Sequence, residues 1–338
     1  MENRRLAVAI DDSEVRLAWI GAGGEVRNET AWPLDRFSTL IEAMLRFEAE
    51  TGQPLWQAAA AIAIYGATYG ESISLHRGRW TISRSGLASI LGTPPTIINH
   101  VAAKGWAAVG GTGIQLAPLS RHGGLPDFTA RNRWLAINVE RGVGLAVIDS
   151  DGSGTLRITE SEMGHCGFAP ASALDRRLAE AVALPRVPAT RWEMVLTVSV
   201  DSPIWTQHLP EVTRTDRLAM LADNVGRFLA DAVTAHCAWG GVMITGKRIV
   251  EFQSAGLTDR LNRAFEEGAK FGRPIQSAPR WRLTGSDLTF SGLAEALART
   301  AVPALAPTTA PVSPAVTPVA GPAPFAEPAP RPSIFNYR

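Results

Sequence analysis

Along the first hundred residues, short apolar runs alternate with stretches whose apolar residues recur every three or four positions. The short runs are typical of buried strands, whereas the spacing of three or four is typical of amphipathic helices. The expected elements are strands over 6–10, 15–20, 58–65 and 96–98 and helices over 35–50 and 83–91. Strands 6–10 and 15–20 are separated by the polar turn Asp11–Glu14, which indicates a β-hairpin. Asn99 and His100 follow the last strand, at the end that faces a crevice in open α/β sheets.

A second set of elements begins near Trp134. The expected elements are paired strands over 134–138 and 143–149 with a turn at 151–154, a long helix over 216–238, a strand over 240–244 and a final helix over 288–301. The strand pattern of the first set recurs here. The sequence therefore indicates a duplicated α/β architecture.

Composition narrows the class of protein. Of the 338 residues, 46% are apolar and 19% are charged, as in soluble globular proteins of roughly two domains. The formal net charge is +1 and neither sign runs in a block, which argues against a nucleic-acid or anionic-membrane partner. No stretch approaches the ~20 apolar residues of a membrane span, and the start has no long apolar leader segment. We therefore expect a cytoplasmic protein.

The chain has only two cysteines, Cys166 and Cys237. They fit a reducing compartment better than a disulfide framework, and no second cysteine lies close enough to support a zinc motif. We expect no bound metal.

The last 38 residues carry ten of the chain's 23 prolines, mixed with alanine, valine and threonine. Such a segment cannot form a packed core and is expected to be extended over 302–338. Apart from the single aromatic residue Phe325, aromatic side chains return only near the end, where Phe335 and Tyr337 follow Ile334. This tip is either a peptide ligand for a protein partner, on a tether formed by the residues before it, or part of a solvated tail.

Several motifs resemble the bacterial-type glucokinase family of the hexokinase/actin-like superfamily, over roughly residues 6–300. The most specific is Glu162–Pro170, which resembles the family's Glu-Gly-Gly-His-x-x-Phe-Ala-Pro. The other similar segments are Asp11–Ala18, Ile62–Ala67, Arg79–Ser83, Ile97–His100, Glu193–Leu196 and Gly240–Gly246. The resemblance implies two ribonuclease-H-like (actin-like) α/β domains with a central crevice. We expect a small domain over 1–117, a large domain over 118–287, a helix over 288–301 that returns to the small domain, and the tail.

The resemblance also implies a hexose site formed by Asn99, Glu162, His165 and Glu193. These residue types suit a sugar, because carboxylates accept hydroxyl protons while Asn and His supply matching donors. Each residue alone is more simply an ordinary polar group at a strand end. The four together, in the order of the family, favour a sugar site.

At the nucleotide, by contrast, the sequence departs from the family. The residues at nucleotide positions are Asp11, Gly144, Gly241 and Gly246, although Asp11 is equally well explained as a turn cap and the late glycines as parts of a turn. Phosphate loops need glycine so that backbone N–H groups can approach the anion. The departures are Asp12, Ser13 and Glu14 in the first loop, Glu140 in the second loop, Thr197 and Val198 after Glu193, and Lys247 after Gly246. The β-branched pair Thr197-Val198 is expected to be strand-like. His100 stands where the family has its aspartate base.

The leading hypothesis is a glucokinase-like pseudokinase: a hexose-binding or adaptor protein with a degraded ATP site and no cofactor, bound to a protein partner by its tail. One alternative is an active hexose kinase that uses Mg-ATP in a divergent nucleotide site. The other is a purely structural accessory subunit. A homodimer is left open by the sequence.

Overall fold

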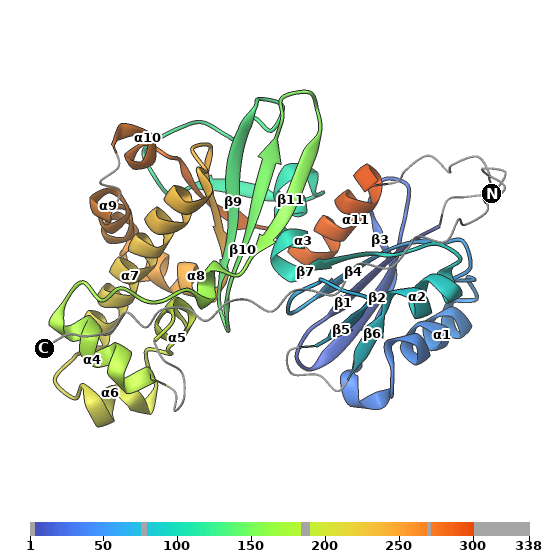
Figure 1. Ribbon diagram of the computed structural model, residues 1–338, viewed down its shortest axis with the longest axis horizontal. Helices are drawn as coiled ribbons and strands as arrows, with labels where there is room; N and C mark the ends of the chain where they lie inside the picture. Colours follow the sequence, from blue (N-terminus) through green and yellow to red (C-terminus); the bar gives the residue numbers. More distant parts are fainter. Residues whose placement is uncertain (1–3, 76–79, 184–189, 269–271, 301–338) are drawn as a thin grey trace, which may run out of the picture. The chain divides into compact units, whose positions relative to one another are not determined.

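The computed structural model describes residues 4–75, 80–183, 190–268 and 272–300 of the chain. Its strands form two main sheets and a small β5-β6 hairpin (Figure 1). The strands are β1 Arg5–Ile10, β2 Glu14–Ile20, β3 Val26–Pro33, β4 Ala59–Ile64, β5 Ser72–Ser74, β6 Thr81–Ser83, β7 Thr96–Asn99, β8 Gln115–Pro118, β9 Asn132–Val139, β10 Val143–Ser150, β11 Leu156–Ser161, β12 Gly241–Thr245 and β13 Arg280–Thr284. The helices are η1 Leu34–Arg36, α1 Leu40–Thr51, α2 Arg84–Leu91, α3 His100–Gly110, η2 Met163–His165, α4 Ala173–Val182, α5 Trp192–Leu196, α6 Pro203–His208, α7 Arg214–His236, α8 Lys247–Ser254, α9 Thr258–Gly268, α10 Arg273–Gln276 and α11 Leu288–Thr300.

The two sheets share one topology. The first has the order β3-β2-β1-β4-β7, and the second has β11-β10-β9-β12-β13 with β8 added at its far edge. In each, three antiparallel strands are followed by two that run parallel to the innermost of the three. This repeat confirms the predicted α/β fold of the actin-like type. The second sheet includes Gln115, so the chain enters it slightly before the predicted division at 117/118.

Side-chain size decides which helices cover each face of the first sheet. Alternate residues of a strand point to opposite faces, and β1 places Leu6, Val8 and Ile10 on the face covered by α1 and α2. The intervening Ala7 and Ala9 lie in a cluster with Phe290 and Leu293 of α11. The final helix thus packs on the first sheet, and the alanines leave room for it.

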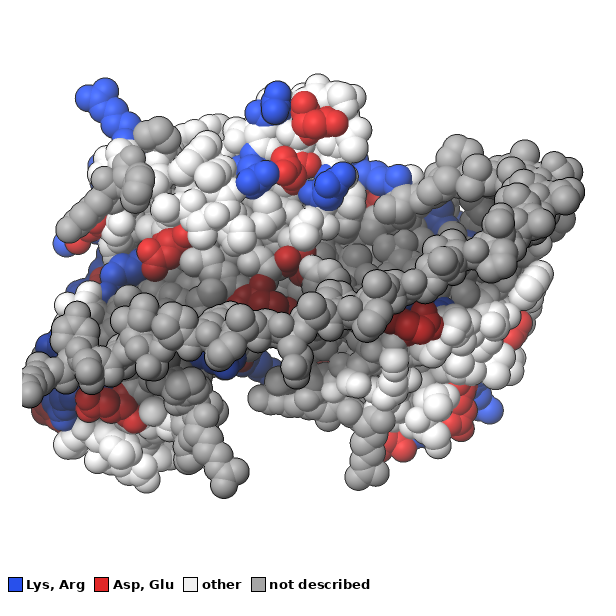
Figure 2. Space-filling model, viewed as in Figure 1, with Lys and Arg blue, Asp and Glu red and all other residues white. Residues whose placement is uncertain are grey.

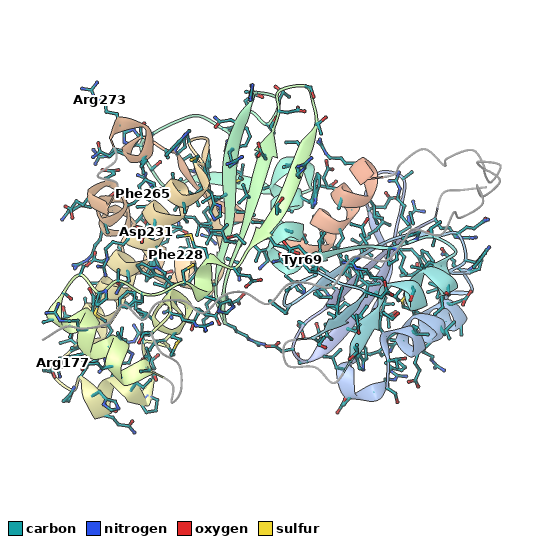
Figure 3. The ribbon with its side chains drawn as sticks, in the orientation of Figure 1. Tyr69, Arg177, Phe228, Asp231, Phe265 and Arg273 are labelled. Atoms are coloured by element: carbon teal, nitrogen blue, oxygen red, sulfur yellow. The ribbon has the colours of Figure 1, made fainter. Side chains whose placement is uncertain are left out.

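Helix α3 lies between the sheets, where glycines allow a close approach. A Cβ on Gly105 of α3 would come within 3.2 Å of Ile158 in β11. Similarly, a Cβ on Gly292 of α11 would overlap the Ala103 backbone of α3. On the other face of the second sheet, α7 and α9 contribute Phe228 and Phe265 to the largest core cluster (Figure 3).

Several predicted boundaries and elements were wrong. The helix predicted over 35–50 begins at Leu40, because Thr39 caps it by accepting from Glu42 N. His100 is the first residue of a helix that was not predicted, with Asn99 as its cap. Strands β3, β8 and β11 and the short helices of 163–208 were also missed. Among the described residues, no helix is long and apolar enough to cross a membrane.

Candidate functional site

A cavity of about 330 Å³ opens where the carboxyl ends of β1, β4 and β7 face the β9–β10 turn, η2 and α5. Carboxyl ends of parallel strands are where α/β folds form ligand sites. The cavity is lined by Asp11, Asp12, Ile64, Tyr65, Gly66, Asn99, His100, Val101, Asn138, Glu140, Arg141, Gly142, Val143, Gly144, Ser161, Glu162, His165 and Glu193. The structure thus brings together all four residues predicted for the sugar, and places His100, Asp11 and Gly144 beside them.

Three of the predicted sugar residues form a chain of polar groups. Glu162 immediately precedes η2, His165 ends it, and Glu193 lies on α5. The His165 imidazole stands between two carboxylates, with Nε2 3.4 Å from Glu162 Oε2 and Nδ1 3.7 Å from Glu193 Oε2. All three side chains are partly exposed. They offer a ligand several acceptors and an imidazole that can donate or accept.

Both the side chain and the backbone N–H of Asn99 make hydrogen bonds. Its Oδ1 accepts from Ala102 N at 2.7 Å, which caps α3, and its backbone N–H donates to Glu160 Oε2 at 3.0 Å. The other oxygen of Glu160 accepts from the Thr68 hydroxyl. With the described residues, the Asn99 amide nitrogen makes no hydrogen bond, so it can donate to a ligand in the cavity.

His100 borders the cavity, but both of its ring nitrogens lie close to protein groups. Its ring is 6% exposed, and Nε2 lies 2.8 Å from the Ile10 carbonyl oxygen, so Nε2 must carry the proton. Nδ1 lies 3.5 Å from the Thr289 hydroxyl, and the Tyr65 ring stacks on the imidazole at 4.2 Å. Burial lowers the pKa of His100 to about 4, so the imidazole is neutral at pH 7. Both ring nitrogens face protein partners from the first sheet and α11.

Asp11 caps the β1–β2 turn. Its Oδ1 accepts from the backbone N–H groups of Ser13 at 2.7 Å and Glu14 at 2.8 Å and from the Ser13 hydroxyl. Burial raises the pKa of Asp11, but these hydrogen bonds outweigh it and hold the pKa below its ordinary value. The backbone donors that a phosphate loop would direct at a ligand are occupied by this carboxylate.

The segment at the second predicted loop, 138–144, is a tight β-turn region. Glu140 N donates to the Gly142 carbonyl at 3.1 Å, and the Glu140 and Arg141 side chains line the cavity. Gly144 is required by packing, because a Cβ there would overlap Val101 of α3. After Glu193 the predicted strand-like pair is wrong: Thr197 N donates to the Glu193 carbonyl at the end of α5.

Gly241 and Gly246, the other two glycines predicted at nucleotide positions, lie at opposite ends of β12. Gly241 begins the strand with φ 117°, and a Cβ there would overlap Pro279 and press on Trp281. Gly246 follows the strand and borders a second cavity of about 290 Å³, formed with α8 and β13. The residues predicted for a nucleotide therefore divide between two cavities, and Gly241 lies in neither.

Within the described ranges, no three His, Cys, Asp or Glu side chains converge closely enough to hold a metal ion. Cys166 and Cys237 are exposed and form no disulfide. On the face shown in Figure 2, basic and acidic side chains are interspersed. Ile334, Phe335 and Tyr337, predicted to bind a partner, lie outside the described residues.

Sequence reasoning missed two residues at the site. Tyr65 lines the cavity and stacks on His100; its position as the last residue of the strand predicted over 58–65 was the available signal. Glu160 links Asn99 to Thr68. No signal pointed to it, since its strand β11 was not predicted.

Comparison with known proteins gives one family and one fold. The glucokinase family model matches residues 9–196, which is more than half of the chain. The fold is similar to that of a glucokinase from an Antarctic psychrotroph, with a TM-score of 0.70 and 19% identity over 89% of this chain and 100% of that one. It is also similar to a Balamuthia mandrillaris glucokinase solved with glucose (TM-score 0.69, 15% identity, 88% and 94% of the two chains) and to a Leishmania braziliensis glucokinase (0.69, 12%, 88% and 93%). No curated protein sequence matches the chain.

Proposed function

The chain belongs to the glucokinase family, and we propose that within this family it binds a hexose without transferring phosphate to it. Its cavity is large enough for one hexose ring, and the four polar residues predicted for sugar hydroxyls line it together. Glu162, His165 and Glu193 supply acceptors for hydroxyl protons, while the amide nitrogen of Asn99 supplies a donor.

The observation that carries the second half of the proposal is the β1–β2 turn. Phosphate is bound in such turns by backbone N–H groups that point at the anion. Here the N–H groups of Ser13 and Glu14 donate to Asp11 Oδ1 instead. The carboxylates of Asp12 and Glu140 also line the cavity, where they repel a triphosphate.

The base position supports the same proposal. A general base must lie within hydrogen-bond reach of the hydroxyl whose proton it removes. The His100 ring nitrogens reach the Ile10 carbonyl and the Thr289 hydroxyl, and the ring is covered by Tyr65. A buried imidazole whose pKa is about 4 is also a weak proton acceptor.

The residues at the cavity do not fit Mg-ATP, the co-substrate that the family implies. Asp11 uses one carboxylate oxygen to cap its own turn, where it occupies backbone N–H groups that would otherwise be available to a phosphate. Gly246 and Lys247 lie at the separate, second cavity or its flanking helix. We therefore assign no step to a nucleotide.

Two titrations test the proposal. Glucose at millimolar concentration should raise the melting temperature of the full chain, and Glu162→Ala should abolish the shift, whereas Glu180→Ala on the exposed side of α4 should keep it. Calorimetry with Mg-ATP should give no binding at micromolar concentration. A micromolar dissociation constant for Mg-ATP, with turnover of glucose, would establish an active hexose kinase instead. If no hexose stabilises the wild-type chain, a purely structural role replaces the proposal.

We further propose, from the sequence alone, that residues 333–338 bind a protein partner. Aromatic and aliphatic side chains at the end of a Pro-rich segment suit a short peptide ligand. Deleting Ser333–Arg338 should abolish co-purification of the partner and leave the melting temperature unchanged. Retained co-purification would place the interface on residues 1–332.

A further inference from the structure

Tyr65 occupies a position in the cavity that the family resemblance does not assign. It is the first residue after β4, at the carboxyl end of the strand. One face of its ring stacks on His100, with centroids 4.2 Å apart and an angle of 22° between the planes. The side chain nevertheless remains 39% exposed and lines the cavity beside Asn99. One face of the ring is thus in contact with His100, while part of the residue remains accessible at the cavity.

The surroundings of the Tyr65 hydroxyl keep it protonated. Burial raises the pKa of the phenol, and the charges of Glu140, Asp11 and Asp12 raise it further, with Arg141 acting in the opposite direction. A protonated phenol is a hydrogen-bond donor among carboxylates. Tyr65 thus combines an apolar face with one polar atom of fixed character.

We propose that Tyr65 is a ligand-contacting residue that determines specificity: its ring covers one face of the His100 imidazole and offers its other face to the C–H groups of a hexose. The inference rests on the proposed function, since the ligand is taken to be a hexose. Aldohexose rings carry patches of C–H groups between their hydroxyls, and an aromatic face is the surface that buries such a patch. The other predicted ligand contacts, from Asn99, Glu162, His165 and Glu193, are all polar. Among the described residues that line the cavity, Tyr65 contributes the one Phe, Tyr or Trp ring, beside the smaller aliphatic side chains of Ile64, Val101 and Val143.

The proposal also explains why His100 is so strongly buried. The Tyr65 ring covers one face of the imidazole at the border of the cavity, and burial is the largest cause of the lowered pKa of His100. Removing the phenol ring should let water reach His100. The pKa of His100 therefore reports, in the absence of any sugar, whether the Tyr65 ring keeps water from the imidazole.

The test uses three variants of the full chain: Tyr65→Ala, Tyr65→Phe and, as a matched control, Tyr69→Ala. Tyr69 lies four residues further on, is 71% exposed and does not line the cavity (Figure 3). Calorimetry with glucose should show affinity reduced roughly tenfold in Tyr65→Ala. Tyr65→Phe should restore most of that loss because it retains the ring, and Tyr69→Ala should match the wild type.

In the same proteins without sugar, NMR titration of the His100 ring protons should place the pKa near 4 in the wild type and in Tyr65→Phe. It should move toward 6.5 in Tyr65→Ala. If the wild type binds glucose and Tyr65→Ala binds it equally well, the proposed function stands and the contact role of Tyr65 is overturned. If the wild type binds no hexose, the proposed function and the contact role both fall. An unchanged pKa of His100 in Tyr65→Ala would overturn the proposal that the Tyr65 ring keeps water from the imidazole.

Discussion

His100 should make the folded chain lose stability as the pH falls below about 6.5. Burial lowers the pKa of the imidazole from 6.5 to about 4, although the hydrogen bond to the Ile10 carbonyl acts in the opposite direction. The charge of Lys104 lowers the pKa further, while the charges of Asp11 and Asp287 raise it. In the unfolded chain the imidazole regains its ordinary pKa. Between the two values, the unfolded chain binds a proton that the folded chain does not.

The sign and size of the effect follow from that difference in pKa. Above about pH 6.5 His100 is neutral in both states, so its contribution to stability is fully present. As the pH falls toward 4 the unfolded state gains free energy of protonation at ~1.4 kcal/mol per pH unit, for a total of about 3 kcal/mol. Between pH 7.5 and 5.0 the loss from this one group is about 2 kcal/mol.

Urea unfolding followed by tryptophan fluorescence can isolate the contribution of His100 to the pH dependence of stability. The free energy of unfolding is measured at pH 7.5 and 5.0 for the wild type, for His100→Gln and for His208→Gln, which removes an exposed histidine of α6. Gln at position 100 can still donate to the Ile10 carbonyl but does not titrate. The wild type and the His208 variant should lose about 2 kcal/mol more than His100→Gln over this range. Equal losses in all three proteins would refute the argument that His100 is buried and neutral.

Three further outcomes are expected. Gly292→Ala should lower stability by about 1–3 kcal/mol, because its Cβ would overlap the Ala103 backbone, whereas Gly124→Ala, which has open space around its Cβ, should leave the melting temperature unchanged. Glu160→Ala should lower the free energy of unfolding by about 1–3 kcal/mol, because the Asn99 N–H loses its acceptor, and Glu160→Gln should recover part of this loss. Equal melting temperatures for the two variants would contradict the assigned hydrogen bonds. His100→Asp should not restore phosphorylation of glucose in a coupled assay, because the backbone donors of the β1–β2 turn remain occupied, and measurable turnover would show that the turn can bind phosphate.

The first sheet shows how far a pattern of residues can be trusted. Strands β1, β2, β4 and β7 were predicted almost to the residue, because an apolar run between turn residues has few other stable conformations. Strand β3 was missed because most of its residues are exposed at the edge of the sheet, where apolar and polar residues no longer alternate. Helix α3 was missed for a different reason. Its small residues, Ala and Gly, carry little periodicity of their own and make sense only between two packed surfaces.

At the site, the residue types and their order pointed to a sugar cavity, and the structure gathers those residues in one place. Sequence left two explanations open for Asp11, and its hydrogen bonds support the turn cap. A side chain at Gly144 would overlap Val101, and one at Gly241 would overlap Pro279. These contacts between distant residues require glycine, and no local motif encodes them. The membership of Gly144 and Gly241 in a nucleotide site stays a prediction without structural support.

The alternation of helix and strand, the duplicated architecture and the set of polar residues that line one cavity could all be predicted from the sequence. These depend on local periodicity and on the order of motifs along the chain. The protonation state of His100, by contrast, could be inferred only from the folded structure. Its proton position and its pKa depend on the Ile10 carbonyl, ninety residues away in sequence, and on the Tyr65 ring that covers it. Burial and hydrogen bonding are properties of neighbours in space, so the same histidine that the sequence places at a base position is, in the folded chain, a neutral buried group.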